Sequence, residues 1–169
     1  MRVLWAPWRL SYVERTEKNQ SCIFCDKPVL TGPAERREAL VLHSDPHSSV
    51  IINKFPYTNG NLMVSPRTHT ADLPGLDAVG STALLETVKL AVSALEEVYS
   101  PQGFNIGMNL GRSAGAGIDE HLHWHVVPRW EGDTNFMPLL AETRVIPEHL
   151  EDCYDRLLPV FERASKSLQ

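Results

Sequence analysis

Apolar and polar residues alternate along the chain in a way that predicts five short strands and two helices. Runs rich in aliphatic and β-branched residues, bounded by turn-forming residues, are typical of strands. They fall at residues 38–42, 49–54, 61–65, 104–110 and 121–127. From Leu76 to Tyr99 apolar residues recur every three or four positions, which predicts one long helix. A terminal helix follows Pro147, and Pro159 can kink it.

Length and composition restrict the class of protein. With 169 residues, 43% of them hydrophobic, the chain suits a single folded domain. We divide it into an N-terminal arm (1–20), a core that carries the motifs (20–130) and a C-terminal extension with a helix (131–169). A net charge of −5 without blocks of like charge disfavours a general nucleic-acid binder. No run approaches the ~18 apolar residues of a membrane span, and no signal peptide is evident, so we expect a cytoplasmic protein.

Three histidines alternate with apolar residues in the last predicted strand. Because successive side chains of a strand point to opposite faces, His121, His123 and His125 would share one face, with Cα atoms roughly 6.5–7 Å apart. Such a row suits an extended polyanion, and imidazole can serve as nucleophile, general acid or metal ligand. Incidental surface histidines are the weaker interpretation, since three of the seven histidines share this spacing.

A glycine-rich loop, from Asn109 to Gly117, precedes the histidine row. Its small residues would let backbone N–H groups approach anionic oxygen atoms. It is not a Walker loop, because no Gly-Lys-Ser/Thr follows. An ordinary connecting loop has a similar composition, but the position before the histidines favours a phosphate cradle.

Cys22 and Cys25 are separated by two residues, a spacing that in a cytosolic chain indicates a metal or redox pair rather than a disulfide framework. Two thiolates at this spacing can bind one tetrahedral Zn²⁺, but further ligands must come from elsewhere. Metal-free thiols remain an alternative, and a redox pair is less favoured because no thioredoxin-type helix start is evident. We assign no chemical role to four other residues. Cys153 is interpreted as a small apolar residue of a helix, and His43, His47 and His149 as surface or loop residues.

These motifs resemble the histidine triad family of nucleotide hydrolases and transferases. Residues 121–127 match its His-x-His-x-His-apolar-apolar signature. Other segments follow the family's order: Asn53, Asn61, Pro66-Arg67-Thr68-His69 and Asn109-x-Gly111. Three further segments look like the bacterial branch of diadenosine tetraphosphate phosphorylases or ATP adenylyltransferases: Leu4-Trp5-Ala6-Pro7-Trp8-Arg9 with the cysteine pair, residues 132–136, and Arg144-Val145-Ile146-Pro147-Glu148.

The resemblance implies covalent catalysis by the triad, in which His123 attacks an α-phosphorus and forms an adenylyl-histidine intermediate. His125 would contact the α-phosphate and the bridging oxygen, where a protonated ring stabilises the leaving polyphosphate. His121 completes the catalytic set. The expected reaction is phosphorolysis of diadenosine tetraphosphate to ADP and ATP, with inorganic phosphate as the acceptor.

Two other functions stay open. The same intermediate can be resolved by water, which would make the protein a hydrolase of dinucleoside polyphosphates or adenosine phosphoramidates. A nucleotide-binding module without turnover is disfavoured, because all three triad positions are histidine.

The resemblance also implies a nucleotide pocket. Asn53 would face the ribose hydroxyls, and residues 55–57 would wall a purine slot, although they equally suit core or turn positions. The family's loop normally ends in Gly-Gln before the triad, whereas this chain has Ala116-Gly117, so Ser113 is taken as the substitute phosphate contact. The predicted nucleotide-binding set is Asn53, Phe55, Asn61, Asn109, Ser113, Gly115 and Gly117.

In relatives with such a cysteine pair, a histidine after the third strand and the first triad histidine complete a zinc site. By position these are His69 and His121, which gives a closed, structural Zn²⁺ site with Cys22 and Cys25. No organic cofactor is expected.

The fold that the resemblance implies is α+β, an antiparallel sheet of about five strands with one long helix and a C-terminal helix. Family members pair through the long helix and the adjacent strand, so we expect a homodimer, with a tetramer also open in this branch. The tryptophan-rich arm would serve either that interface or the active site.

Overall fold

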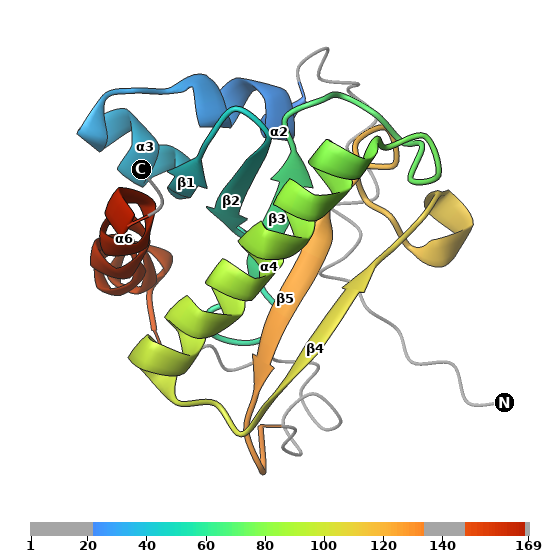
Figure 1. Cartoon of the computed structure of the whole chain (residues 1–169). Helices are drawn as coiled ribbons and strands as arrows, with labels where there is room; N and C mark the ends of the chain where they lie inside the picture. Colours follow the sequence, from blue (N-terminus) through green and yellow to red (C-terminus); the bar gives the residue numbers. More distant parts are fainter. Residues whose placement is uncertain (1–21, 134–147, 168–169) are drawn as a thin grey trace, which may run out of the picture.

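The computed structural model describes residues 22–133 and 148–167. The predicted N-terminal arm, and the segments at 134–136 and 144–147 that carry bacterial-branch motifs, lie outside this part. The described residues form one antiparallel sheet in the order β1-β2-β3-β5-β4 (Figure 1), which confirms the α+β prediction. Its strands are β1 (Val41–Ser44), β2 (Ser48–Ile52), β3 (Leu62–Pro66), β4 (Gly103–Met108) and β5 (Trp124–Arg129).

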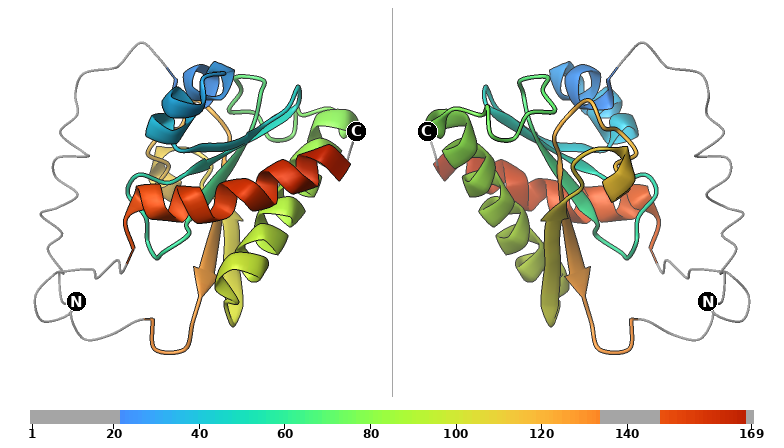
Figure 2. Two further views of the ribbon diagram at one scale, coloured as in Figure 1. Left: turned by 90° about the vertical axis from the view of Figure 1, so that its left-hand side faces the viewer. Right: turned by 90° about the vertical axis from the view of Figure 1, so that its right-hand side faces the viewer.

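Two long helices pack on the sheet. Helix α4 (Ala78–Tyr99) lies diagonally across one face, and α6 (Leu150–Ser167) crosses the β1 edge and contacts both β1 and α4 (Figure 2). Pro159 lies inside α6, which continues to Ser167. Short helical segments complete the described fold: α2 (Ile23–Asp26), η2 (Lys27–Val29), α3 (Pro33–Ala39) and η3 (Arg112–Ala114).

Helix α4 begins where a side chain caps it. Asp77 accepts a hydrogen bond from the backbone N–H of Gly80 at 2.6 Å, which satisfies one of the free donors of the first turn. Leu84, Val88 and Leu95 follow at helical spacing and are buried against the sheet. Within the described part of the chain, α4 alone is long and apolar enough to cross a membrane by length and composition.

The two faces of the sheet have different surroundings: one packs against α4 and α6, and the other carries the histidines of the triad. Val50 and Ile52 of β2 join the large core under α4 and α6, whereas Ile51 between them joins a small cluster with Phe24 of α2. In β5 the same alternation buries Val126 in the large core. The neighbouring residue, His125, therefore points to the face away from α4.

The first predicted strand, at 38–42, is wrong in its first half. Residues Pro33–Ala39 form α3, which opens on a proline, carries two arginines in its last turn and ends at Leu40 with φ +61°. Strand β1 therefore begins only at Val41.

The last strand begins later than predicted, at Trp124 instead of residue 121. The N–H of Leu122 donates to the carbonyl oxygen of Thr70 at 2.7 Å, so this segment is held by the loop after β3 and not by a strand ladder. Among the triad histidines, His125 lies in β5, while His121 and His123 lie in the approach to it.

The interpretation of His43 as a surface or loop residue is also wrong. Its ring is buried in β1, with Nε2 at 3.1 Å from a carboxylate oxygen of Asp45 and Nδ1 at 3.1 Å from the hydroxyl of Ser165 in α6. The histidine joins the end of α6 to the sheet. Cys153 is buried in the large core, as predicted.

Two residues of α4 test this packing. Leu95 is fully buried, whereas the side chain of Lys89 is 63% exposed. We expect Leu95→Ala to lower the free energy of unfolding by about 2–5 kcal/mol, because it leaves a cavity. We expect Lys89→Ala to change it by less than about 0.5 kcal/mol. Denaturant titration measures both, and equal losses would contradict this orientation of α4.

Candidate active site and metal centre

The triad histidines gather on the sheet face opposite α4. His125 pairs across the sheet with Met63 of β3 and Gly107 of β4, so it lies in the middle of the sheet. The rings of His123 and His125 meet edge to face, with centroids 5.1 Å apart. The prediction that the imidazoles share one face therefore agrees with this geometry, although two of them precede the strand.

The ring of His123 is fixed by two contacts. Phe24 of α2 stacks on it, with centroids 4.7 Å apart and planes 27° from parallel. The Nδ1 atom lies 2.9 Å from the backbone carbonyl oxygen of His121, and since a carbonyl only accepts, Nδ1 carries the hydrogen. Burial lowers the pKa of His123 despite this hydrogen bond. The neutral ring therefore carries its free lone pair on Nε2, in the state required of a nucleophile.

His125 offers an unused polar atom. Its Nδ1 is buried and has no hydrogen-bond partner among the described residues. Burial, and to a lesser extent the neighbouring His123, lower the pKa of His125 to about 4, so the ring is neutral at pH 7 in the empty protein. An anionic ligand beside the ring would raise that pKa and favour the protonated form.

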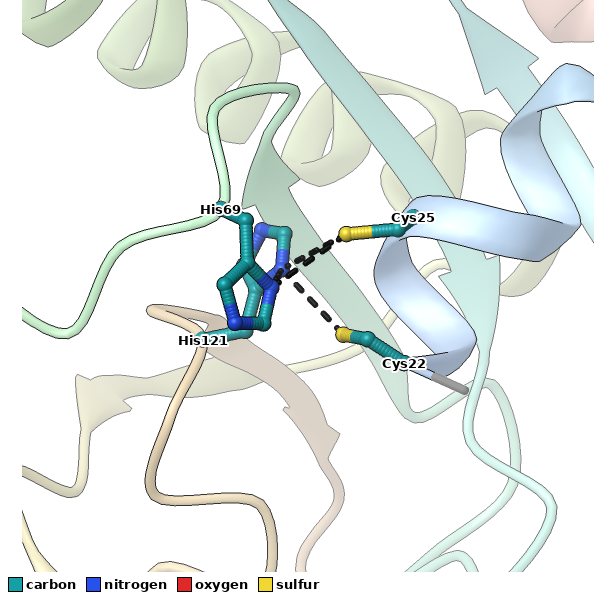
Figure 3. Close-up of side chains that lie close together, drawn as sticks. All are labelled: Cys22, Cys25, His69 and His121. Carbon is teal, nitrogen blue, oxygen red and sulfur yellow. Dashed lines mark hydrogen bonds between the residues drawn. The ribbon is translucent and has the colours of Figure 1, made fainter. Parts of the chain in front are cut away.

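A second cluster shares His121 with the triad (Figure 3). Its other members are Cys25 of α2, Cys22 immediately before that helix, and His69 from the loop after β3. The Nδ1 atom of His121 is 3.3 Å from the sulfur of Cys22 and 3.2 Å from Nδ1 of His69. The sulfur of Cys25 is 3.3 Å from Nδ1 of His69. The predicted ligand set is thus brought together from segments far apart in the sequence.

The distances within this cluster are close to those of a tetrahedral metal site. Ligand atoms at bond lengths of about 2.0–2.3 Å from zinc lie roughly 3.3–3.8 Å from one another. Four of the six pairs of ligand atoms lie 3.2–3.6 Å apart, and all six lie within 4.8 Å. The opposite nitrogen of His121, Nε2, donates to the backbone carbonyl oxygen of Pro66 at 2.9 Å, which leaves the Nδ1 lone pair facing the cluster. Burial and the neighbouring Cys22 raise the pKa of the Cys25 thiol, a penalty that a bound cation would offset.

The residues predicted for the sugar and base lie on the β2–β3 connection. Asn53 is half-buried, and its side-chain oxygen accepts a hydrogen bond from the N–H of Phe55 at 2.9 Å. Phe55 is 57% exposed, and the ring of Tyr57 meets that of His125 with centroids 6.0 Å apart. Asn61 is fully buried, yet neither atom of its side-chain amide has a partner within the described residues. These positions remain a predicted pocket next to His125.

The predicted phosphate loop closes on itself beyond β4. Asn109 follows the Met108–Trp124 pair of the sheet, so it lies next to the approach that carries His123. Its side-chain amide is 3.4 Å from the carbonyl oxygen of Gly115, which has φ +90°. Ser113 lies within η3, and Ser113, Gly115 and Gly117 are exposed. Their role as phosphate contacts stays a prediction.

The sequence of this chain matches that of a known protein family. The model of the HIT domain matches residues 35–132, which are more than half of the chain and include the whole sheet. The chain belongs to the HIT family. The predicted family membership is confirmed. The AP-4-A phosphorylase of Mycobacterium tuberculosis is 36% identical to this HIT protein over 157 residues, which cover 88% of the chain and 78% of the relative.

Solved structures share the fold of this HIT protein. A Zn-bound histidine triad family protein from Mycobacterium smegmatis has a TM-score of 0.66 and 27% identity, covering 88% of this chain and 98% of that one. A hypothetical histidine triad nucleotide-binding protein from Sulfolobus tokodaii has a TM-score of 0.62 and 26% identity, with 87% and 93% covered.

One residue of this HIT protein's site was missed by sequence reasoning. Phe24 is fully buried and touches the rings of both His121 and His123. Its position between the two cysteines of the Cys-x-x-Cys motif was the available signal, because any residue there is carried to the metal cluster. The predicted zinc site includes His121, so the motif already pointed toward the triad, but nothing in the sequence indicates that the ring of Phe24 stacks on His123.

Proposed function

We propose that this HIT protein is an adenylyltransferase that cleaves diadenosine tetraphosphate by phosphorolysis, giving ADP and ATP. The observation that carries the proposal is the neutral His123, whose ring is held by Phe24 and by the carbonyl oxygen of His121, and which lies beside His125 on the sheet face opposite α4. The 36% identity to a mycobacterial AP-4-A phosphorylase supports the choice of substrate.

In the first step Nε2 of His123 attacks the α-phosphorus of the substrate. A nitrogen–phosphorus bond forms, the bond from phosphorus to the bridging oxygen breaks, and ATP leaves. The hydrogen bond from Nδ1 to the carbonyl oxygen of His121 stabilises the positive charge that develops on the ring. In the second step inorganic phosphate attacks the same phosphorus, ADP leaves, and the histidine is regenerated.

His125 is proposed to act on the departing oxygen. Its ring is neutral in the empty protein, and we propose that the polyphosphate brings it into the protonated form. The ring then donates a hydrogen bond to the bridging oxygen as negative charge builds there. Non-bridging oxygens are assigned to Asn109, Ser113 and the backbone N–H groups of Gly115 and Gly117.

The nucleoside is proposed to lie along the β2–β3 connection. Asn53 would bind the ribose hydroxyls, Asn61 would offer its side-chain amide, which has no partner within the described residues, and Phe55 would cover the purine. A buried amide without a partner is costly, so a ligand that supplies hydrogen bonds to Asn61 would be favoured.

The metal cluster is proposed to hold one Zn²⁺. Two thiolates and two imidazoles form a closed set that such an ion prefers, and their spacing fits it. The ion would have a structural role, since four protein ligands leave no position for a substrate. Holding His121 through Nδ1 also holds the carbonyl that orients His123.

We further propose that two copies of the chain pair through α4 and the edge strand β4. Large apolar side chains are exposed along these elements, namely Val79 and Leu85 on α4 and Ile106 on β4. Strand β4 is at the edge of the sheet, so one side of it is not paired within the described chain.

We also propose that the protein is cytoplasmic. Cys22 and Cys25 are not joined in a disulfide, and thiols are kept reduced in that compartment.

The reaction is tested by incubating the purified protein with diadenosine tetraphosphate, with and without inorganic phosphate, and separating the products by chromatography. We expect ADP and ATP, and only when phosphate is present. AMP and ATP formed without phosphate would make water the acceptor and the protein a hydrolase. No product in either reaction would contradict the proposal and favour a binding module.

A further inference from the structure

The loop that joins β2 to β3 is attached to the rest of the protein by hydrogen bonds of its own side chains. We call residues 53–61 the nucleotide loop. Thr58 donates a hydrogen bond from its hydroxyl to the carbonyl oxygen of Pro128 at 3.1 Å. The next residue, Asn59, donates from its side-chain amide to a carboxylate oxygen of Glu148 at 2.7 Å. The loop is therefore fixed by β5 on one side and by Glu148, just before α6, on the other.

Glu148 is the centre of a small cluster of polar side chains, most of them partly buried. Besides Asn59, its carboxylate accepts hydrogen bonds from the hydroxyl of Tyr99, at the end of α4, and from the guanidinium of Arg156 in α6, at 2.9 Å. Arg156 also lies over the ring of Tyr99, 4.5 Å from its centroid. The side chain of Glu148 is only 13% exposed. One carboxylate thus joins both long helices to the nucleotide loop.

The charge of Glu148 suits this role. Burial would raise the pKa of its carboxyl group, but the hydrogen bonds from Tyr99, Arg156 and Asn59 outweigh burial and hold the pKa below its ordinary value. The group is therefore ionised at neutral pH, and hydrogen bonds to a charged acceptor are stronger than those between neutral groups.

Close packing also restricts the nucleotide loop at Gly60, the residue after Asn59. Gly60 is buried with φ +70°, and a Cβ atom there would lie 3.0 Å from a methyl group of Leu95. At its other end, the N–H of Asn53 donates to the carbonyl oxygen of Asn61 at 2.9 Å. Between these fixed points the loop carries Tyr57, whose ring meets His125. A shift at Asn59 would be felt two residues away, beside the triad.

We propose that Glu148 is a positioning residue for the substrate: by holding Asn59, it fixes the nucleotide loop so that Tyr57 stands beside His125. This inference rests on the proposed function, because it assigns the loop to nucleotide binding. Glu148 does not touch the substrate. It acts on ground-state binding, since the nucleophile His123 is held by Phe24 and His121 and not by this loop.

The test compares Glu148→Gln and Asn59→Ala with the wild-type protein. We expect each variant to raise KM for diadenosine tetraphosphate about tenfold, with kcat changed by less than about twofold, because the hydrogen bond between Asn59 and the charged carboxylate is lost or is weakened to one with a neutral amide, while the triad is intact. The double variant should be no worse than the more affected single variant, because both changes remove the same contact. Glu151→Gln, the same change at an exposed position of α6, should behave as wild type.

A second readout needs no substrate. Amide hydrogen exchange at residues 53–61 of the empty protein should be faster in Glu148→Gln and in Asn59→Ala, and unchanged in Glu151→Gln. If Glu148→Gln does not fold, as judged by circular dichroism, Asn59→Ala carries the test, because it leaves the contacts of Glu148 to both helices in place.

The outcomes separate this inference from the function on which it rests. Folded variants with unchanged KM and unchanged loop exchange would overturn the role of Glu148 while leaving the adenylyltransferase intact. A loss of kcat at constant KM would also overturn it, because that pattern indicates damage to the triad. If the wild-type protein does not turn over the substrate, the proposed function fails and this inference fails with it.

Discussion

Replacing His123 with alanine should abolish adenylyl transfer without unfolding the protein. The variant lacks the nucleophilic nitrogen, and we expect kcat/KM to fall at least about 10⁴-fold, the loss typical of removing a catalytic nucleophile. Intact-protein mass spectrometry after brief incubation with diadenosine tetraphosphate should detect an AMP adduct on the wild-type chain and none on the variant.

Two controls accompany this prediction. His47→Ala changes an exposed histidine and should retain full activity and the adduct. Because His123→Ala leaves a cavity against Phe24, His123→Gln, which fills more of that space, should be equally inactive. An adduct or substantial turnover in either His123 variant would remove this residue from its role.

Loss of the metal should destabilise the whole protein. We expect about one zinc ion per chain after purification without chelator, and much less in Cys25→Ser. Since binding at such a site contributes directly to folding, the variant should lose about 3 kcal/mol or more of stability, equivalent to a fall of roughly 6–12 °C in Tm. Elemental analysis and thermal unfolding measure the two effects.

Cys153→Ala is the matched control for the metal prediction, because Cys153 is buried in the large core away from the cluster. It should lose some stability through its packing but keep its zinc. A wild-type chain purified without zinc, or a Cys25→Ser variant with normal zinc content, would contradict the assignment of the four ligands.

The parts of the site that the sequence predicted best are motifs whose residues lie close together along the chain. The histidine row and the Cys-x-x-Cys pair are local patterns, and His69 was added through a family resemblance; all three converge in space. The strands were found within a few residues because the apolar runs of β1, β2, β3 and β5 are buried in the sheet, while the edge strand β4 shows the alternation of apolar with polar or small residues.

Long-range contacts explain what the sequence did not reveal. Because Leu122 is hydrogen-bonded to Thr70, β5 begins only at Trp124, and nothing near residue 121 in the sequence indicates this hydrogen bond. His43 was misjudged for the same reason, since its partner Ser165 lies more than a hundred residues away. Phe24 could not be distinguished from any apolar residue between two cysteines until α2 was placed against the triad.

The contact between Gly60 and Leu95 has a consequence for engineering this protein. A Cβ atom at Gly60 would lie 3.0 Å from a methyl group of Leu95, so the nucleotide loop lies close to the main core. A larger or differently branched side chain at position 95 would press against this loop, so we expect a redesign of the core there to change stability and the position of the loop together. Stabilising substitutions are better sought at Lys89 or Glu86, on the solvent side of the same helix, where the two properties are independent.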